Sequence, residues 1–201
     1  MATITKLGLA DHGRAMTLDE FFEGDYEEGY KYELIEGRLE VSPAAGLPHE
    51  VLRMWIIARL SAHALSHPSE MNFVSGHPRV IIRGAAGPSA PEADTAGYRN
   101  FPLDADLDEL DWPSVNPILL VEVISGGTAD KDTERNVRLY RRVRTLQEYW
   151  IIDPRPDSNR PSLTVHRRAG RRWEIIEVPF GAMHTTPLLP SFSLVVDPRS
   201  R

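Results

Sequence analysis

The most constraining stretch of the sequence is an aliphatic run over residues 116–125, Asn-Pro-Ile-Leu-Leu-Val-Glu-Val-Ile-Ser. Its apolar residues follow one another without polar alternation, and β-branched residues gather in its second half. This pattern is typical of a strand that is buried on both faces. Glu122 lies in the middle of the run. Because an ionised carboxylate is costly in a dry interior without a cation, a metal ion or strong donors beside it, Glu122 is the first candidate functional residue.

Length and composition favour one globular domain. The chain has 201 residues, of which 41% are hydrophobic and 26% charged, so it can bury a sizeable core. We expect a loose leader over residues 1–16 and a single domain over 17–201. The sequence has no cysteine, which excludes disulfides and thiolate metal sites. It offers no export signal and no apolar stretch of membrane-spanning length, so we expect a cytoplasmic protein that does not associate with membranes.

Local patterns predict a mixture of strands and helices. A capping box at Thr17 to Glu20 begins the first helix, and Glu36-Gly37 is the turn of an N-terminal hairpin. We expect helices over 17–22, 49–67 and from Thr128 or Asp130 to about 144. We expect strands over 32–35, 38–41, 74–82, 94–98, 116–125, 148–153, 163–166 and 173–178. An apolar tail over 188–196 should dock on the body. The order predicts an α+β or α/β fold with one mixed sheet flanked by helices.

Asp94 stands at the start of a predicted strand, one loop before the strand that holds Glu122. Strands separated in this way commonly pair in one sheet, which would bring the two carboxylates together. Two carboxylates beside a main-chain carbonyl suit Mg²⁺, an ion that can activate water and offset charge on a phosphodiester. Structural roles remain open, because Asp94 can cap a turn and Glu122 can be satisfied by an arginine or by main-chain donors.

Asn136 is the polar residue that stands out on the helix after the long strand. On a helical wheel it occupies the middle of the apolar face and points back at the sheet, whereas Lys131 points away. A buried amide needs a hydrogen-bond partner, and a helix-to-loop hydrogen bond would also provide one. His49 begins the long amphipathic helix, where both a surface position and one facing the acids are open.

The order of motifs resembles the Uma-type restriction endonuclease family of the PD-(D/E)xK nuclease superfamily. The resemblance runs from about Thr17 to Val196. It is carried by Tyr32-Glu33-Leu34-Ile35-Glu36-Gly37, by Asp94 before Ala96 and Tyr98, by Leu120-Val121-Glu122-Val123-Ile124-Ser125, by Asp130-Lys131-Asp132, by Leu139-Tyr140 and by Glu148-Tyr149-Trp150-Ile151-Ile152-Asp153-Pro154. It implies a restriction endonuclease-like core, a mixed β-sheet flanked by helices with an N-terminal β-hairpin extension.

The resemblance also implies roles for individual residues. Asp94 and Glu122 match the two metal-ligating acids, although Ala93 stands where the motif prefers proline. The carbonyl of Val123 would be the third protein ligand. Glu33 matches a further acid that could bind metal or water, although a plain surface acid on the hairpin remains open.

A second position also departs from the family pattern. Asn136 occupies the place of the catalytic lysine, so it can hold water but carries no charge. The chain has three lysines, and Lys31, which shares a strand face with Glu33, could substitute, as could Lys131 or Arg135.

Together these features predict a Mg²⁺-dependent endonuclease, with Mn²⁺ as a possible substitute ion, that hydrolyses phosphodiester bonds in DNA. The basic residues after the long strand and those over 167–172 would contact phosphates. Because duplex DNA has pseudo-twofold symmetry, we expect a homodimer. The alternative is a catalytically degraded nuclease-fold module that binds nucleic acid or protein.

Overall fold

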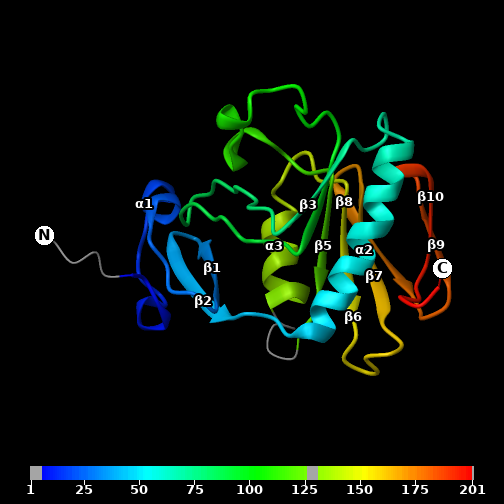
Figure 1. Cartoon of the computed structure of the whole chain (residues 1–201), viewed down its shortest axis with the longest axis horizontal. Coiled ribbons are helices and arrows are strands. Elements are labelled where there is room, and N and C mark those ends of the chain that lie inside the picture. The colour runs from blue at the N-terminus through cyan, green and yellow to red at the C-terminus, as the bar shows by residue number, and fades with distance from the viewer. Residues whose placement is uncertain (1–5, 126–130, 201) are drawn as a thin grey trace, which may run out of the picture. The chain divides into compact units, whose positions relative to one another are not determined.

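The structure is a computed structural model that describes residues 6–125 and 131–200. The chain divides into two compact units, which are described separately. Unit 1 comprises residues 1–45 and 79–92, and unit 2 comprises residues 46–78 and 93–201 (Figure 1). The sequence predicts a single domain over residues 17–201, and both units contain residues of that range. The single domain stays a prediction. The predicted helix start at Thr128 or Asp130 lies outside the described residues.

Unit 1 is built around a β-hairpin. Its elements are η1 (Leu9–Asp11), α1 (Leu18–Glu23), β1 (Tyr30–Ile35) and β2 (Arg38–Pro43). The capping box is present, since the Thr17 amide donates to the Glu20 carboxylate at 2.7 Å and the Glu20 amide donates to the Thr17 hydroxyl at 3.2 Å. Glu36 and Gly37 have φ values of 49° and 77°, as a tight hairpin turn of this kind requires. The predicted N-terminal hairpin is confirmed.

The first described residues belong to the core of unit 1. For residues 1–16 the sequence predicts a loose leader, but residues 6–16 contain the 3₁₀ turn η1 and bury Leu7 and Met16. Both side chains pack in one cluster with Leu34, Leu39 and other residues of the hairpin. Apolar burial of this kind ties the segment to the hairpin.

Unit 2 holds one six-stranded mixed sheet in the order β3-β4-β5-β6-β7-β8. Strands β5 and β6 are parallel, and every other neighbouring pair is antiparallel. A separate two-stranded hairpin pairs β9 with β10. The elements of the unit are α2 (Leu47–Ser66), β3 (Phe73–Gly76), β4 (Thr95–Tyr98), η2 (Leu107–Glu109), η3 (Trp112–Ser114), β5 (Leu119–Val123), η4 (Lys131–Arg135), α3 (Asn136–Tyr140), β6 (Glu148–Asp153), β7 (Ser162–Ala169), β8 (Arg172–Val178), β9 (Met183–Thr186) and β10 (Leu189–Val195). The predicted mixed sheet is confirmed.

Two predicted elements are too long. The strand predicted over 74–82 ends at Gly76, because His77 has a φ of 56° and Pro78 lacks an amide proton. The helix predicted to reach 144 consists of the π-helical turn η4 and the short α3, which ends at Tyr140. Beyond it, the Arg168 guanidinium binds the carbonyls of Val143 and Leu146 at 2.8 and 2.7 Å. These carbonyls therefore do not need helical partners.

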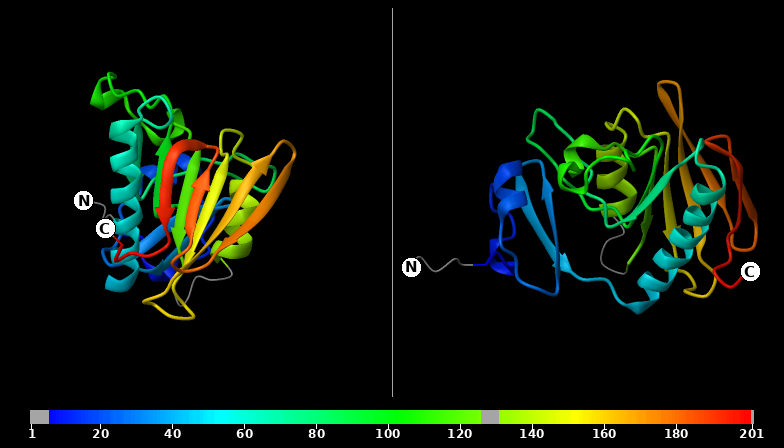
Figure 2. Two further views of the ribbon diagram at one scale, coloured as in Figure 1. Left: turned by 90° about the vertical axis from the view of Figure 1, so that its right-hand side faces the viewer. Right: turned by 45° about the horizontal axis from the view of Figure 1, so that its top comes forward.

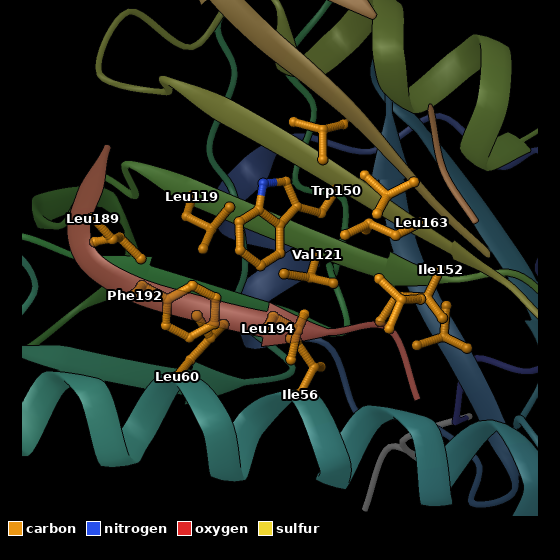
Figure 3. Packing of buried hydrophobic residues seen from close by; sticks show 14 of the residues in the cluster. Ile56, Leu60, Leu119, Val121, Trp150, Ile152, Leu163, Leu189, Phe192 and Leu194 are labelled. Atoms are coloured by element: carbon orange, nitrogen blue, oxygen red, sulfur yellow. The ribbon is translucent and has the colours of Figure 1, made fainter. Parts of the chain in front are cut away.

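The main core fills one face of the sheet. Leu119, Val121 and Val123 alternate along β5 and point to this face, where they meet Ile56 and Leu60 of α2. Figure 3 shows Leu119, Val121, Ile56 and Leu60 packed with Trp150 and Ile152 of β6. Phe192 and Leu194 of β10 close the cluster from the same side. Helix α2 crosses in front of the sheet in Figure 1. The docking of the apolar tail, predicted from its composition, is confirmed.

The opposite face of the sheet carries the polar residues of interest. Because side chains alternate along a strand, Glu122 on β5 and Tyr149 on β6 point away from α2. There the Tyr140 ring of α3 lies edge-on to Tyr149, with ring centroids 5.1 Å apart. Figure 2 shows α2 and α3 on different sides of the sheet. Among the helices of residues 6–125 and 131–200, none is both long and apolar enough to cross a membrane.

Leu60 tests how much the α2–sheet contact stabilises the protein. Its side chain is fully buried, whereas Leu65 on the same helix is 86% exposed. We expect Leu60→Ala to lower the free energy of unfolding by about 2–5 kcal/mol, because it removes buried methyl groups and leaves a cavity. Leu65→Ala should change it by no more than about 0.5 kcal/mol. Urea unfolding of both variants measures this, and equal effects would contradict the packing described here.

Candidate active site

The two predicted acids meet where β4 begins and β5 ends. Thr95 pairs with Val121 in the antiparallel register of β4 and β5, so Asp94 comes opposite Glu122. The Asp94 amide donates to Glu122 Oε2 at 3.2 Å, and the Val123 amide donates to Asp94 Oδ2 at 2.7 Å. The residues Asp94 and Glu122 are 3% and 2% exposed. The sheet therefore holds two buried carboxylates side by side, as the sequence spacing predicts.

Glu122 is held by uncharged donors on its other oxygen. Asn136 Nδ2 donates to Glu122 Oε1 at 3.1 Å, and the Tyr140 hydroxyl donates to the same atom at 2.9 Å. Both donors lie on α3, one turn apart, so that they reach the same strand position. These neutral donors satisfy hydrogen-bonding capacity without cancelling the negative charge of Glu122.

A third buried carboxylate, Asp132, completes the cluster. Asn136 Nδ2 also donates to Asp132 Oδ1, at 3.1 Å, and Asp132 is 3% exposed. Asn136 itself is fully buried, and its Oδ1 accepts from Arg135 Nε and Nη2 at 3.2 and 3.0 Å. The amide thus connects two carboxylates to one guanidinium. The prediction that Asn136 points back at the sheet is confirmed, whereas Asp132 was not a predicted site residue.

The electrostatic effect of the three acids is visible on Tyr149. Burial, followed by the negative charges of Glu122, Asp132 and Asp94, raises the pKa of Tyr149 well above its ordinary value. The Tyr149 hydroxyl stays protonated and donates to the main-chain carbonyl of Asp132 at 3.0 Å. Three acids gathered in a buried region attract a cation, because charge in a low-dielectric interior is poorly screened.

His49 is a second residue that sequence reasoning left undecided. It lies in the first turn of α2, and its Nε2 is 2.9 Å from Asp94 Oδ2. Its side chain is 11% exposed, so the surface alternative does not describe it. The sequence signal for this contact was the position of His49 at the start of a long amphipathic helix. Tyr140, by contrast, was not a predicted site residue.

A cleft of about 450 Å³ opens beside these residues. His49 and Leu52 of α2 line one side, and Ser125, just after β5, lines another. Arg155 also lines the cleft, and its guanidinium binds the Asp153 carboxylate at 2.9 and 2.7 Å. The volume lies in the usual range of small-ligand sites. The cleft is connected to the acids through His49, which lines it and contacts Asp94.

The other predicted site residues lie on β1 of unit 1 and on η4 of unit 2. Glu33 and Lys31 are on β1 of unit 1, where the Glu33 carboxylate is 2% exposed and accepts from the Glu92 amide at 3.0 Å. The surface alternative for Glu33 is therefore excluded. Lys131 is the first residue of η4, near Asp132, and is partly exposed. The site roles predicted for Glu33, Lys31 and Lys131 stay predictions.

The donor set fits a hard divalent cation. Asp94 and Glu122 supply carboxylate oxygens, and Val123 follows Glu122 with a main-chain carbonyl, which is the type of ligand that Mg²⁺ and Mn²⁺ prefer. Within residues 6–125 and 131–200, no group of three or more His, Asp and Glu side chains is arranged to hold a metal ion. The predicted set needs only two acidic side chains, so this finding does not bear on it.

The fold is of the restriction endonuclease-like class, as the comparisons with known proteins show. The sequence profile of the Uma2 family, described as "Putative restriction endonuclease", matches residues 18–197. The chain therefore belongs to the Uma2 family, which supports a nuclease. A crystal structure described as a "putative nuclease belonging to DUF820" from Anabaena variabilis aligns with a TM-score of 0.68 at 17% identity, covering 90% of this chain and 95% of that one. This likeness shows the fold. Among curated proteins, no match is found.

Asn136→Asp tests the charge balance of the cluster. The substitution removes the amide that donates to Glu122 and Asp132 and places a further carboxylate between them. We expect it to lower the free energy of unfolding at pH 8 by about 2–5 kcal/mol, because buried like charges would lose their shared donor. Urea unfolding measures the effect. The matched control is Asn100→Asp at an exposed position, and a loss no larger than that of the control would contradict the description.

Proposed function

We propose that this protein is a metal-dependent endonuclease that hydrolyses phosphodiester bonds in DNA, with Mg²⁺ as the ion and Mn²⁺ as a substitute. The single observation that carries the proposal is the juxtaposition of Asp94 and Glu122, both buried, at one point of the sheet. Membership in a family described by restriction endonuclease activity supports it. Such enzymes generally use a divalent metal ion, and the buried acids provide suitable oxygen ligands.

Asp94, Glu122 and the Val123 carbonyl would hold the ion. When bound, the ion would lower the pKa of a water and offset negative charge on the phosphate. For Glu122 to serve, its Oε1 keeps the hydrogen bonds from Asn136 and Tyr140, which fix the carboxylate in one orientation. His49 holds Asp94 in the same way from the side of the cleft.

The positive charge that a lysine would bring comes, in this proposal, from Arg135. Its guanidinium donates to the side-chain oxygen Oδ1 of Asn136. The positive charge of Arg135 therefore lies one hydrogen bond away from Asn136, which occupies the position of the family's lysine. A guanidinium there can stabilise an oxyanion that develops at the phosphate, and the Asn136 amide can orient water. Lys131 of η4 and Lys31 of β1 are the other candidates for this charge, and Glu33 would assist.

The substrate would approach through the cleft between His49 and Arg155. Phosphate contacts would come from exposed arginines after α3 and at the β7–β8 connection, namely Arg142, Arg144, Arg171 and Arg172. We further propose that the protein works as a homodimer in the cytoplasm, since a twofold dimer matches the symmetry of duplex DNA.

A plasmid assay with Mg²⁺ or Mn²⁺ tests the activity. We expect the wild-type protein to nick or linearise supercoiled DNA, and Glu122→Gln to reduce the rate by about 100-fold or more, because it removes a charged ligand from the reaction centre. Asn136→Lys should raise the rate by about tenfold or more, since it restores a cation beside Glu122. Asn159→Lys, which adds the same charge at an exposed position, should leave the rate unchanged.

The same assay separates the second candidate function, a nuclease fold that binds without cleaving. The observation that favours it is the uncharged Asn136 in the lysine position. Cleavage by Asn136→Lys alone would identify a degraded nuclease. If no variant cleaves and none binds Mn²⁺, the nuclease proposal is wrong and a binding module remains.

Metal binding gives a readout that does not need activity. We expect saturating Mn²⁺ to stabilise the wild-type protein by about 2.7 kcal/mol at an ion concentration of about 100 times Kd, because only the folded state assembles the ligands. Glu122→Gln should be at least as stable as wild type without metal, since it removes one of three clustered charges, and should gain nothing from Mn²⁺. Thermal unfolding measures both effects.

Glu109→Gln is the control for that experiment, because Glu109 is exposed on η2. It should keep the full Mn²⁺ stabilisation. Equal stabilisation of Glu122→Gln and the wild type would place the ion elsewhere and contradict the proposed ligand set.

A further inference from the structure

A polar cavity in unit 2 lies at the other end of the sheet from the acid cluster. Its volume is about 580 Å³, and it is lined by residues at the starts of β5 and β6, including Ile118 and Glu148. Because β5 and β6 are parallel, both begin at this edge and both end at the edge that holds Glu122. Four residues of strand separate Ile118 from Glu122, about 13 Å. The cavity is therefore distinct from the candidate active site.

Three arginines converge on this cavity, namely Arg99, Arg167 and Arg168. Arg99 donates to the carbonyls of Glu70 and Leu188 at 2.8 and 3.2 Å. Arg168 donates to the carbonyls of Val143 and Leu146 and stacks on Trp173, with its Cζ 4.6 Å from the ring centroid. Neutral carbonyls fix both guanidinium groups without cancelling their charge.

Glu148 is the one acid among the described residues that line the cavity, and its carboxylate already accepts hydrogen bonds from protein groups. Its side chain is 1% exposed, and it accepts from Arg167 Nε at 2.5 Å, from the Thr186 hydroxyl at 2.6 Å and from Trp150 Nε1 at 2.7 Å. Glu148 and Arg167 therefore neutralise each other. Arg99 and Arg168 form no ion pair within the described ranges 6–125 and 131–200. The lining thus keeps a net charge of about +2, counted from its one acid and three guanidinium groups.

Unused donors accompany this charge. In the part of the chain that the structure describes, Nη1 makes no hydrogen bond in any of the three arginines. A purely structural role accounts for the hydrogen bonds that Nε and Nη2 of these arginines donate to protein groups. It does not explain why three guanidinium groups line one cavity. Planar, fixed guanidinium groups with free N–H groups match the oxygens of a phosphate, because they can form charge-assisted hydrogen bonds with little loss of side-chain entropy.

The rest of the lining suits an organic ligand with polar edges. Asn100, Asn116 and Gln147 bring amides, and Ile118, Pro187 and Leu188 bring an apolar surface. The volume lies within the usual range for sites that enclose a small molecule. We propose that this cavity binds a phosphorylated small molecule of mononucleotide size, with its phosphate on Arg99 and Arg168. The phosphates of a nucleic-acid backbone present the same kind of oxygens. The titration below therefore compares a free monophosphate with an oligonucleotide.

Calorimetric titration of the full chain, without divalent metal, tests the proposal. The probes are the four ribonucleoside monophosphates, adenosine, and a single-stranded oligonucleotide without terminal phosphates. We expect saturable binding of at least one monophosphate, and binding of adenosine weaker by about tenfold or more, because the nucleoside lacks the charged hydrogen-bond acceptors. Equal binding of AMP and adenosine, or no saturable binding at about 1 mM, would overturn the proposal.

Two substitutions at one position separate electrostatics from folding. Arg99→Gln and Arg99→Lys both remove the planar fork that binds two carbonyls, but only Arg99→Lys keeps the charge. We expect Arg99→Gln to weaken the binding of the monophosphate by about tenfold or more, and Arg99→Lys to weaken that binding less. Arg160→Gln, at an exposed position after β6, should have no effect. Equal losses in both Arg99 variants would indicate a structural clamp and overturn the assignment, as would Arg99-dependent binding of the oligonucleotide alone.

Discussion

The structure around the candidate site depends on one physical constraint, the charge of Glu122 in the aliphatic strand β5. The alternation of that strand sends Leu119, Val121 and Val123 into the main core and leaves Glu122 on the other face, beneath α3. The protein meets the carboxylate there with Asn136 and Tyr140, which donate hydrogen bonds but bring no charge. The neighbouring buried acids, Asp94 and Asp132, add negative charge at the same point of the sheet, and this concentration of charge is the physical basis of the proposed cation site.

Much of this arrangement could be predicted from the sequence because the signals were local and strong. The aliphatic run around Glu122 identified a buried strand, and the acid inside it identified a site. The Glu36-Gly37 turn and the Thr17 capping box are short-range patterns with their own geometry. The pairing of Asp94 with Glu122 followed from the loop between their strands. In each case a few neighbouring residues decide the outcome.

Other features depend on residues that are distant in sequence, so no local pattern could show them. Helix α3 ends early because Arg168, on β7, satisfies carbonyls of the segment that would have continued it. His49 contacts Asp94 only because α2 packs on the sheet in one register. Asp132 joins the cluster through a π-helical turn that periodicity does not predict. Leu7 and Met16 looked like part of a leader because their burial requires the hairpin that follows them.

The central claim is that the buried carboxylates of Asp94 and Glu122 share a divalent ion. The most direct measurement is anomalous X-ray scattering from crystals of the wild-type protein grown with Mn²⁺. The account predicts a Mn²⁺ peak bound by one oxygen of each carboxylate and by the Val123 carbonyl, and the loss of that peak in Glu122→Gln crystals. A well-ordered site without a peak, with Asp94 and Glu122 hydrogen-bonded only to protein groups, would contradict it.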